Sequence, residues 1–194
     1  MLPALDRWVV QHLLNWVSDH PARQKTFYSI YLPSATLSDP GFPEVVREPL
    51  RSRPLNGNHL CFELAETEAL SRPAKVVKFI GQLKPDDCLF ALSGIGLALL
   101  SVDLLKRMRV DYLKISSDII LSFLRDPADL AKVTAINRMA HTMGICTIAE
   151  FVESEQTLAK LRELQVDFAQ GFGISRPRPL DESTRTMRGQ PGPA

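Results

Sequence analysis

Apolar runs typical of β-strands alternate with amphipathic helical segments along the whole chain. Glycine, proline and polar residues separate the runs. Regular alternation predicts parallel strands joined by helices, because a parallel pair of strands needs a long crossover connection. Two architectures remain open, a doubly wound open sheet and a βα barrel. The six predicted strands are Phe27–Leu32, His59–Ala65, Cys88–Leu92, Asp111–Ile115, Ile145–Ala149 and Val166–Ala169.

Seven predicted helices precede or connect these strands. The most regular one, residues 130–143, carries apolar side chains at helical spacing, and Gly144 ends it. Pro49 should end the second helix early, because proline lacks the N–H that the helix needs. The predicted helices are Pro3–Asp19, Phe42–Leu50, Ala74–Leu83, Leu99–Met108, Ser117–Leu124, Leu130–Met143 and Glu155–Leu164.

Charge and hydropathy exclude two classes of partner. The 194 residues include 23 Lys and Arg and 22 Asp and Glu, so the net charge is +1. Such a chain lacks the basic surface that a nucleic acid polymer requires. The longest uncharged run, Cys88–Val102, is shorter than the roughly 20 residues that span a bilayer, and Gly94 and Gly96 interrupt it. We expect neither nucleic acid binding nor membrane insertion.

The N-terminal residues and the cysteines indicate a cytoplasmic protein. Asp6 and Arg7 precede any long apolar stretch, which argues against a secretory signal. Cys61, Cys88 and Cys146 lie far apart and show no C-x-x-C spacing, so neither disulfides nor a zinc site is expected. Reduced thiols are typical of the cytoplasm.

A glycine-containing segment follows the third predicted strand. Residues 93–96 (SGIG) resemble the start of a dinucleotide-binding turn, but Leu99 stands where the third glycine would be needed for close helix packing. A tight turn from strand to helix is therefore favoured over a nucleotide-binding turn.

Polar side chains cluster near the carboxyl ends of four predicted strands. In a βα barrel these ends converge on one face, where active sites lie. Carboxylates there can hold Mg²⁺ and activate water, and a lysine can neutralise phosphate charge. For each residue taken alone, a rim charge or a Lys–Glu pair is the favoured interpretation, but six such groups at the ends of four strands favour a site. They are Glu63, Glu66, Lys114, Glu150, Glu153 and Gln170.

Five separated segments resemble motifs of one known family. Residues 63–66 (ELAE), 111–116 (DYLKIS) and 149–153 (AEFVE) resemble ELTE, DYLKID and AEGVE. Residues 29–42 (SIYLPSATLSDPGF) resemble a strand and loop that contain S-V-N-L-S and D-P-x-F. Residues 167–180 (DFAQGFGISRPRPL) resemble D-Y-x-Q-G-Y-x-x-x-x-P-x-P. In this order the motifs resemble those of the EAL domain family, bacterial phosphodiesterases specific for cyclic di-GMP.

This resemblance covers nearly all of Leu5–Leu180 and implies a modified TIM barrel. We expect an EAL-like domain over residues 1–180 and a disordered tail over residues 181–194. The family's first strands, with the E-A-L motif, would lie before Met1, so an incomplete barrel is expected. The resemblance also implies a ligand-binding role for the six polar residues. Among them Glu63 and Glu150 are vestigial metal ligands, Glu66 steadies a neighbouring loop, and Glu150, Lys114 and Glu153 are vestigial catalytic residues.

Three positions depart from the family pattern. Tyr31 stands at a metal-ligand asparagine, and a phenol replaces an amide oxygen on Mg²⁺ only by ionising. Ser93 and Gly94 stand at the paired aspartates. With these ligands and the E-A-L motif missing, we expect catalysis to be lost and no cofactor to bind, with Mg²⁺ or Mn²⁺ relevant only to residual activity.

These departures favour a regulatory or protein-interaction module in cyclic di-GMP signalling. One alternative is a receptor that binds cyclic di-GMP without cleaving it, and a second is a residual metal-dependent phosphodiesterase. Two interpretations of the apolar 95–102 loop, with Leu97, Leu99 and Leu100, stay equally open: it repacks onto the gap left by the missing strands, or it fills the degenerate site or binds a partner. A homodimer mate or protein partner could bind through this loop and through the open barrel edge. The helix that begins near Pro3 could instead fill the gap.

Overall fold

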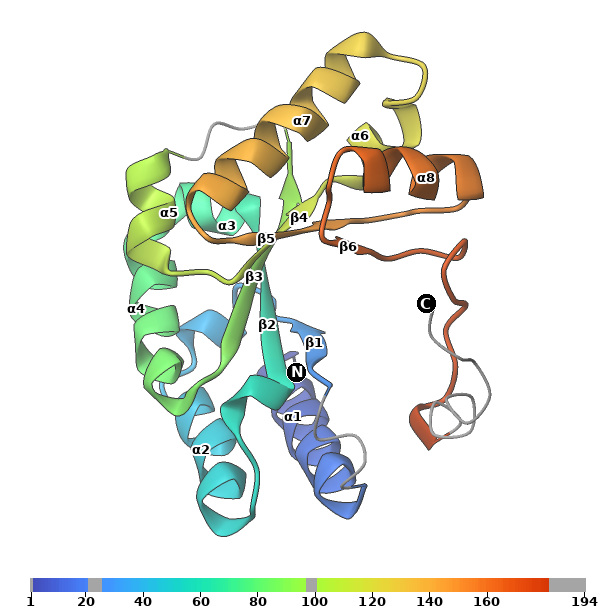
Figure 1. Ribbon diagram of the computed structural model, residues 1–194. Helices are drawn as coiled ribbons and strands as arrows, with labels where there is room; N and C mark the ends of the chain where they lie inside the picture. Colours follow the sequence, from blue (N-terminus) through green and yellow to red (C-terminus); the bar gives the residue numbers. More distant parts are fainter. Residues whose placement is uncertain (1, 21–25, 97–100, 182–194) are drawn as a thin grey trace.

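The sheet of the computed structural model is parallel and curls into a half-barrel (Figure 1). The structure describes residues 2–20, 26–96 and 101–181. Neighbouring strands along the chain are also neighbours in the sheet, in the order β1-β2-β3-β4-β5-β6. This arrangement confirms the predicted α/β fold and its six strands. The strands are β1 (Tyr28–Tyr31), β2 (Leu60–Ala65), β3 (Leu89–Ile95), β4 (Tyr112–Ile115), β5 (Cys146–Ala149) and β6 (Phe168–Ala169).

Eight α-helices lie in the described ranges, and short 3-10 turns at Thr36–Ser38, Gly57–His59 and Lys84–Asp86 accompany them. Helix α7 begins earlier than predicted, because the Asp126 side chain accepts a hydrogen bond from the Ala128 N–H at 2.8 Å and Pro127 occupies the first turn. The helices are α1 (Leu2–Asp19), α2 (Phe42–Ser52), α3 (Glu66–Ser71), α4 (Pro73–Leu83), α5 (Val102–Met108), α6 (Ser117–Ser122), α7 (Pro127–Thr142) and α8 (Glu155–Glu163).

Two sequence predictions about local structure were wrong. Helix α2 continues past Pro49 to Ser52, and Pro49 is buried, so its packing outweighs the lost backbone hydrogen bond. Strand β3 continues through residues 93–95, where a turn was predicted. Its pairing with β4 shifts register between Leu92 and Ile95, and Gly94 has a φ of +77° there. The glycine that suggested a turn therefore lies within an irregular part of the strand.

The main core lies between the sheet and the helices. Successive strand residues point to opposite faces, and fully buried phenylalanines of β2 and β3 meet those of α2 and α4. The Phe62 ring lies 5.9 Å from that of Phe42 and 5.8 Å from that of Phe90, and Phe79 contacts Phe90 edge-on. Each such side chain contributes about 2–3 kcal/mol by burial, so these four rings anchor the strands that carry the site.

A ladder of three aromatic rings crosses the concave face of the sheet. Phe27, just before β1, stacks on Tyr112 of β4 with ring centroids 5.1 Å apart. Tyr112 in turn contacts Phe168 of β6 edge-on at 5.9 Å. Strands β1 and β6 are the two edges of the sheet, and within the described ranges no further strand pairs with either of them. The ring ladder therefore connects the two edges across the interior.

Helix α1 and the C-terminal segment connect the same two edges from outside. Helix α1 packs against α2, and its Trp16 ring contacts Tyr28 of β1 edge-on at 5.8 Å. The segment after β6 contacts α1 at its end, where Trp16 Nε1 donates a hydrogen bond to Asp181 Oδ1 at 2.6 Å. Helix α1 therefore packs beside the edge strand β1 and against α2. The expected disordered tail lies, from residue 182 on, outside the described residues.

Two further expectations concern membrane-spanning helices and the state of the cysteines. Within the described ranges, no helix has both the length and the apolar character needed to cross a membrane. Cys61, Cys88 and Cys146 are free thiols in the structure. Burial raises the pKa of the Cys61 and Cys88 thiols to about 12, which leaves both protonated at neutral pH.

Candidate functional site

Three strands bring an ion-pair triad to the carboxyl end of the half-barrel. Lys114 lies on β4, Glu63 on β2 and Glu150 directly after β5. Lys114 Nζ donates to both Glu63 carboxylate oxygens at 2.8 Å and lies 3.0 Å from Glu150 Oε1. The Lys114 side chain is only 4% exposed. The predicted convergence of these three residues is therefore observed, and the triad carries a net charge of −1.

The lysine of this triad stays protonated at neutral pH. Burial lowers the pKa of Lys114, but the hydrogen bond from Lys114 to Glu63 and the charges of Glu63 and Glu150 raise it more, so its pKa is above the usual value. Ser29 of β1 also donates a hydrogen bond to Glu63 Oε1. The ammonium and the hydroxyl together satisfy much of the Glu63 carboxylate.

The donor set around the triad does not fit a divalent metal. Tyr31 is aligned with Glu63 in the β1–β2 register, but its side chain is exposed and its phenol is a poor Mg²⁺ ligand. Ser93 is aligned with Ala65, and Gly94 offers no side-chain ligand. Glu63 and Glu150 both bind the Lys114 ammonium. Within the described ranges, no three His, Cys, Asp or Glu side chains are grouped closely enough to hold a metal ion.

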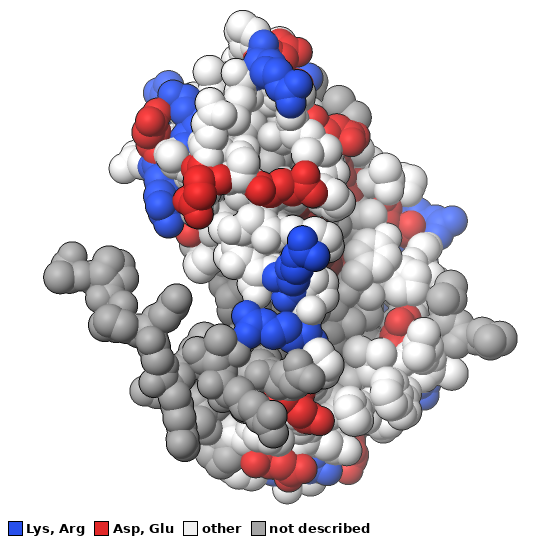
Figure 2. Space-filling model, turned by 90° about the vertical axis from the view of Figure 1, so that its right-hand side faces the viewer, with Lys and Arg blue, Asp and Glu red and all other residues white. Residues whose placement is uncertain are grey.

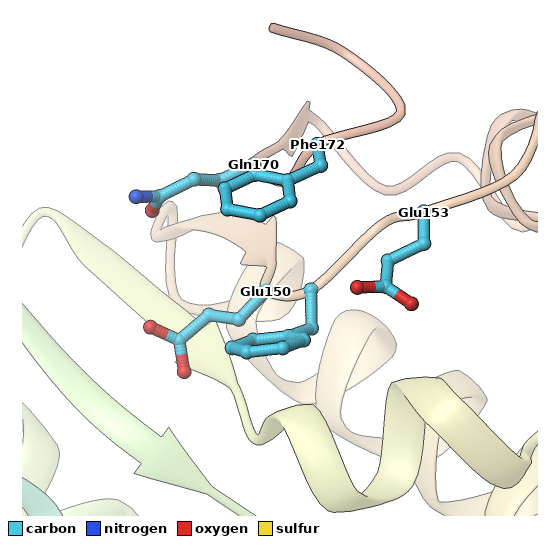
Figure 3. A pocket seen from close by; sticks show the side chains of 6 residues that line it. Glu150, Glu153, Gln170 and Phe172 are labelled. Atoms are coloured by element: carbon cyan, nitrogen blue, oxygen red, sulfur yellow. The ribbon is translucent and has the colours of Figure 1, made fainter. Parts of the chain in front are cut away.

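A pocket of about 200 Å³ adjoins the triad and shares Glu150 with it. Glu153 follows β5 and Gln170 follows β6, and Figure 3 shows both side chains at the pocket together with Glu150. Glu66 does not line this pocket. It is 5% exposed in the first turn of α3, where the sequence predicted no helix. The structure thus brings together five of the six predicted residues, in two adjoining groups.

Two phenylalanines complete the pocket and were missed from the sequence. Phe151 follows Glu150, and Phe172 follows the Gln170–Gly171 pair. Both residues line the cavity and are exposed, Phe151 to 56% and Phe172 to 61%. Phe151 has a φ of +57°, a left-handed conformation that bulky residues rarely adopt. The sequence signal that could have singled out Phe151 is its position, because phenylalanine stands where the AEGVE motif has glycine.

Gly171 allows the two pocket segments to lie against each other. A Cβ atom there would lie 2.3 Å from Val152 N and O, so a larger residue would separate the backbones. The Val152 N–H donates to Gln170 O at 3.0 Å, and the Gly173 N–H donates to Val152 O at 2.9 Å. These bonds fix the spacing between Phe151 and Phe172.

A parallel βα half-barrel with its polar site at the carboxyl ends of the strands defines a TIM-barrel type of protein. The EAL domain model matches residues 1–177, and the chain belongs to the EAL domain family. This result confirms the resemblance seen in the sequence motifs.

Curated relatives and solved structures agree with this assignment. The chain is 29% identical over 181 residues to the cyclic di-GMP phosphodiesterase PdeB of Shewanella oneidensis. The aligned region covers 93% of this chain and 21% of that protein. It is 26% identical over 178 residues to the cyclic di-GMP phosphodiesterase PdeF of Escherichia coli, covering 91% of this chain and 24% of that protein. The chain therefore spans about a fifth to a quarter of the length of these relatives.

Two solved structures share the fold over most of the chain. The FimX EAL domain of Xanthomonas citri, in complex with cyclic di-GMP, superposes with a TM-score of 0.86 at 25% identity and covers 92% of this chain and 71% of that chain. The PaMucR phosphodiesterase, also a cyclic di-GMP complex, gives a TM-score of 0.84 at 25% identity, covering 93% of this chain and 74% of that chain.

Proposed function

We propose that this chain is a non-hydrolysing EAL domain that acts as a regulatory or protein-interaction module in cyclic di-GMP signalling in the cytoplasm. The observation that carries the proposal is the triad, in which the Lys114 ammonium binds both Glu63 and Glu150. A metal ion at these carboxylates would have to displace a buried cation. Tyr31, Ser93 and Gly94 offer little to compensate for that loss.

The electrostatics of the site support the loss of hydrolysis. Metal-dependent attack on a phosphodiester needs cations that activate water and neutralise the phosphate. The triad already uses its one lysine to neutralise two carboxylates, and Glu153 adds a further negative charge nearby. No residue of the described site supplies the charge of two divalent ions.

Product analysis tests this proposal directly. Purified chain is incubated with cyclic di-GMP in Mg²⁺ and separately in Mn²⁺, and the nucleotides are separated by chromatography. We expect no linear dinucleotide above the protein-free control. Metal-dependent turnover that Glu63→Ala abolishes would overturn the proposal and support a residual phosphodiesterase. Circular dichroism of both proteins confirms that they are folded.

A second function, binding of cyclic di-GMP without cleavage, is favoured by the open pocket beside the triad. Its lining combines carboxylates, an amide and two rings, and the FimX and PaMucR structures are cyclic di-GMP complexes. Calorimetric titration with cyclic di-GMP in Mg²⁺ tests this function. Saturable binding heat without linear product would support the receptor function. If folded protein gives no binding heat, the interaction module is the function that stays supported.

A protein partner or second copy is proposed to bind at the open edges of β1 and β6. The other predicted contact, the 95–102 loop, cannot be placed fully, because Leu97, Leu99 and Leu100 lie outside the described residues. Sedimentation velocity across a range of concentrations measures self-association.

A further inference from the structure

A groove runs between helices α5 and α7 on the outer side of the half-barrel. Helix α5 packs against α4, whereas α7 packs against α6 and β5. Figure 1 shows the carboxyl end of α7 beside α5. Two adjoining cavities, of about 640 and 510 Å³, occupy the space between these helices, and both are lined by Val102, Thr142 and Met143. Together they form the α5–α7 groove.

The floor of the α5–α7 groove is largely apolar. Val102 of α5 is 44% exposed there, and Met139 and Met143 are half-buried. Methionine side chains adjust to the shape of a partner, because they are unbranched and flexible. Along α7 the groove is lined at positions 131, 134, 135, 138, 139 and 142, which is the spacing of one helical face. This face is about 16 Å long, or about three turns, at roughly 1.5 Å per residue, so it suits a partner helix laid along it.

The charged side chains that line the α5–α7 groove are all basic. Lys106 and Arg109, at the end of α5, and Arg138 of α7 line its cavities, and no described Asp or Glu does. Within the described ranges, these three side chains form no ion pair and no hydrogen bond. The lining therefore carries a charge of +3 that the protein itself does not neutralise.

This charge distinguishes the groove from other parts of the surface. The side of the molecule in Figure 2, which faces away from α5, carries both acidic and basic side chains. The whole chain has a net charge of only +1. An apolar floor with unpaired basic side chains is complementary to a helix that has an apolar face and acidic residues beside it.

We propose that the α5–α7 groove binds an acidic amphipathic helix of a partner protein. Apolar side chains of that helix pack on Val102, Met139 and Met143, and its Asp or Glu side chains pair with Lys106, Arg109 and Arg138. This inference rests on the proposed interaction module, since it names the chemistry of the partner. Among the described residues, the groove shares none with the Lys114 triad or with the pocket beside that triad, so it is a separate site.

Selection of peptides on the whole chain tests the groove. A phage-displayed library of helical peptides, about 18 residues long so that the helix is stable, is selected on the natural chain, and enriched peptides are synthesised with a fluorescent label. Fluorescence anisotropy measures their Kd for the natural chain and for three variants. Ala135→Trp fills the groove, and a double variant, Lys106→Glu with Arg138→Glu, reverses two of its charges. Arg125→Glu with Arg162→Glu is the matched control, because both arginines are exposed, form no ion pair in the described part of the chain and line neither cavity.

We expect the enriched peptides to carry acidic residues beside an apolar helical stripe. Ala135→Trp should weaken their binding at least tenfold. The charge-reversed groove variant should bind them at least about fivefold more weakly, because each reversal replaces an attraction by a repulsion. Raising the salt concentration from about 0.05 M to about 0.5 M should weaken binding to the natural chain. The control should bind within twofold of the natural chain.

The outcomes separate the groove from the proposed function. A library that yields no binder, or peptides that bind both groove variants as tightly as the natural chain, overturn the groove, and enrichment of basic peptides overturns its preference for acidic helices. If sedimentation velocity shows a dimer that Ala135→Trp dissociates, the occupant is a second copy of this chain and the partner helix is refuted. Linear dinucleotide formed from cyclic di-GMP by the natural chain overturns the non-hydrolysing function while the groove stands. Melting curves show that weakened binding is not unfolding.

Discussion

Replacement of Lys114 by methionine should destabilise the protein in a pH-dependent way. The Lys114 ammonium lies 2.8 Å from the Glu63 oxygens and 3.0 Å from Glu150 Oε1, with its side chain 4% exposed. At these distances each charge pair is worth about 6 kcal/mol with an effective dielectric of about 20. The desolvation of three charges offsets much of this attraction. Methionine matches the lysine stem in size, so the change removes mainly the charge.

Lys114→Met loses unfolding free energy because two carboxylates remain without a cation. Removing one partner of a buried ion pair costs about 3–5 kcal/mol, which is a large part of a typical unfolding free energy of about 5–15 kcal/mol. For a chain of this size, a loss of 3 kcal/mol corresponds to roughly 6–12 °C in Tm.

The raised pKa of Lys114 determines how its contribution to stability changes at alkaline pH. Since the pKa of Lys114 is raised on folding, its stabilisation is fully present below the unfolded pKa of about 10.4 and is lost as the pH rises through the higher folded pKa. The difference between natural chain and variant should therefore be constant from pH 7 to pH 9.

Urea unfolding followed by fluorescence at pH 7 and pH 9 measures these differences. Lys160→Met is the matched control, because Lys160 pairs with Glu163 at 2.7 Å on the surface, with side chains 37% and 64% exposed, and should matter little. A loss below 1 kcal/mol for Lys114→Met, or a deficit that differs between pH 7 and pH 9, would refute the electrostatic account of the triad.

Three further predictions concern metal, backbone strain and thiol reactivity. Mn²⁺ should raise the Tm of Lys114→Met, whose carboxylates have lost their cation, and leave the natural chain unchanged; equal shifts in a thermal scan would contradict this. Phe151→Gly should be more stable than Phe151→Ala by about 1 kcal/mol, since both lose the ring but only glycine relieves the positive φ; denaturant unfolding measures it, and a more stable alanine variant would disprove the strain. Cys61 and Cys88, with pKa raised to about 12, should react with a thiol reagent at pH 8 far more slowly in the native protein than in urea; rapid native labelling of both in a mass-spectrometric time course would show that burial does not protect them.

The convergence of Glu63, Lys114 and Glu150 was predictable because parallel strands place their carboxyl ends on one side of a sheet. Alternation in the sequence therefore located the triad before any distance was known. The hydrogen bonds within the triad were not predictable, since a lysine near two carboxylates fits a ligand site and an ion pair equally well.

Local backbone conformation accounts for what the sequence reading missed. Helix α3, Glu66–Ser71, is too short to show helical periodicity. The burial of Pro49 depends on its neighbours in the fold, which spacing does not show. The positive φ of Phe151 arises from contacts between the segments after β5 and β6, so the residue looked like an ordinary apolar position within AEFVE. Comparison with the glycine of the related motif was the one sequence signal for it.

The three-ring ladder on the concave face has a consequence for the order of folding. Every strand pairs with its neighbour along the chain, so the sheet can grow in steps through contacts of modest sequence separation. Phe27 and Phe168, by contrast, are 168 − 27 = 141 residues apart and meet only through Tyr112. Closing so long a loop carries a large entropy cost that the rings recover only once the strands between them are in place. We therefore expect the curvature of the half-barrel to be set late in folding. The Tyr112→Ala variant should unfold much faster than the natural chain while it folds at nearly the same rate.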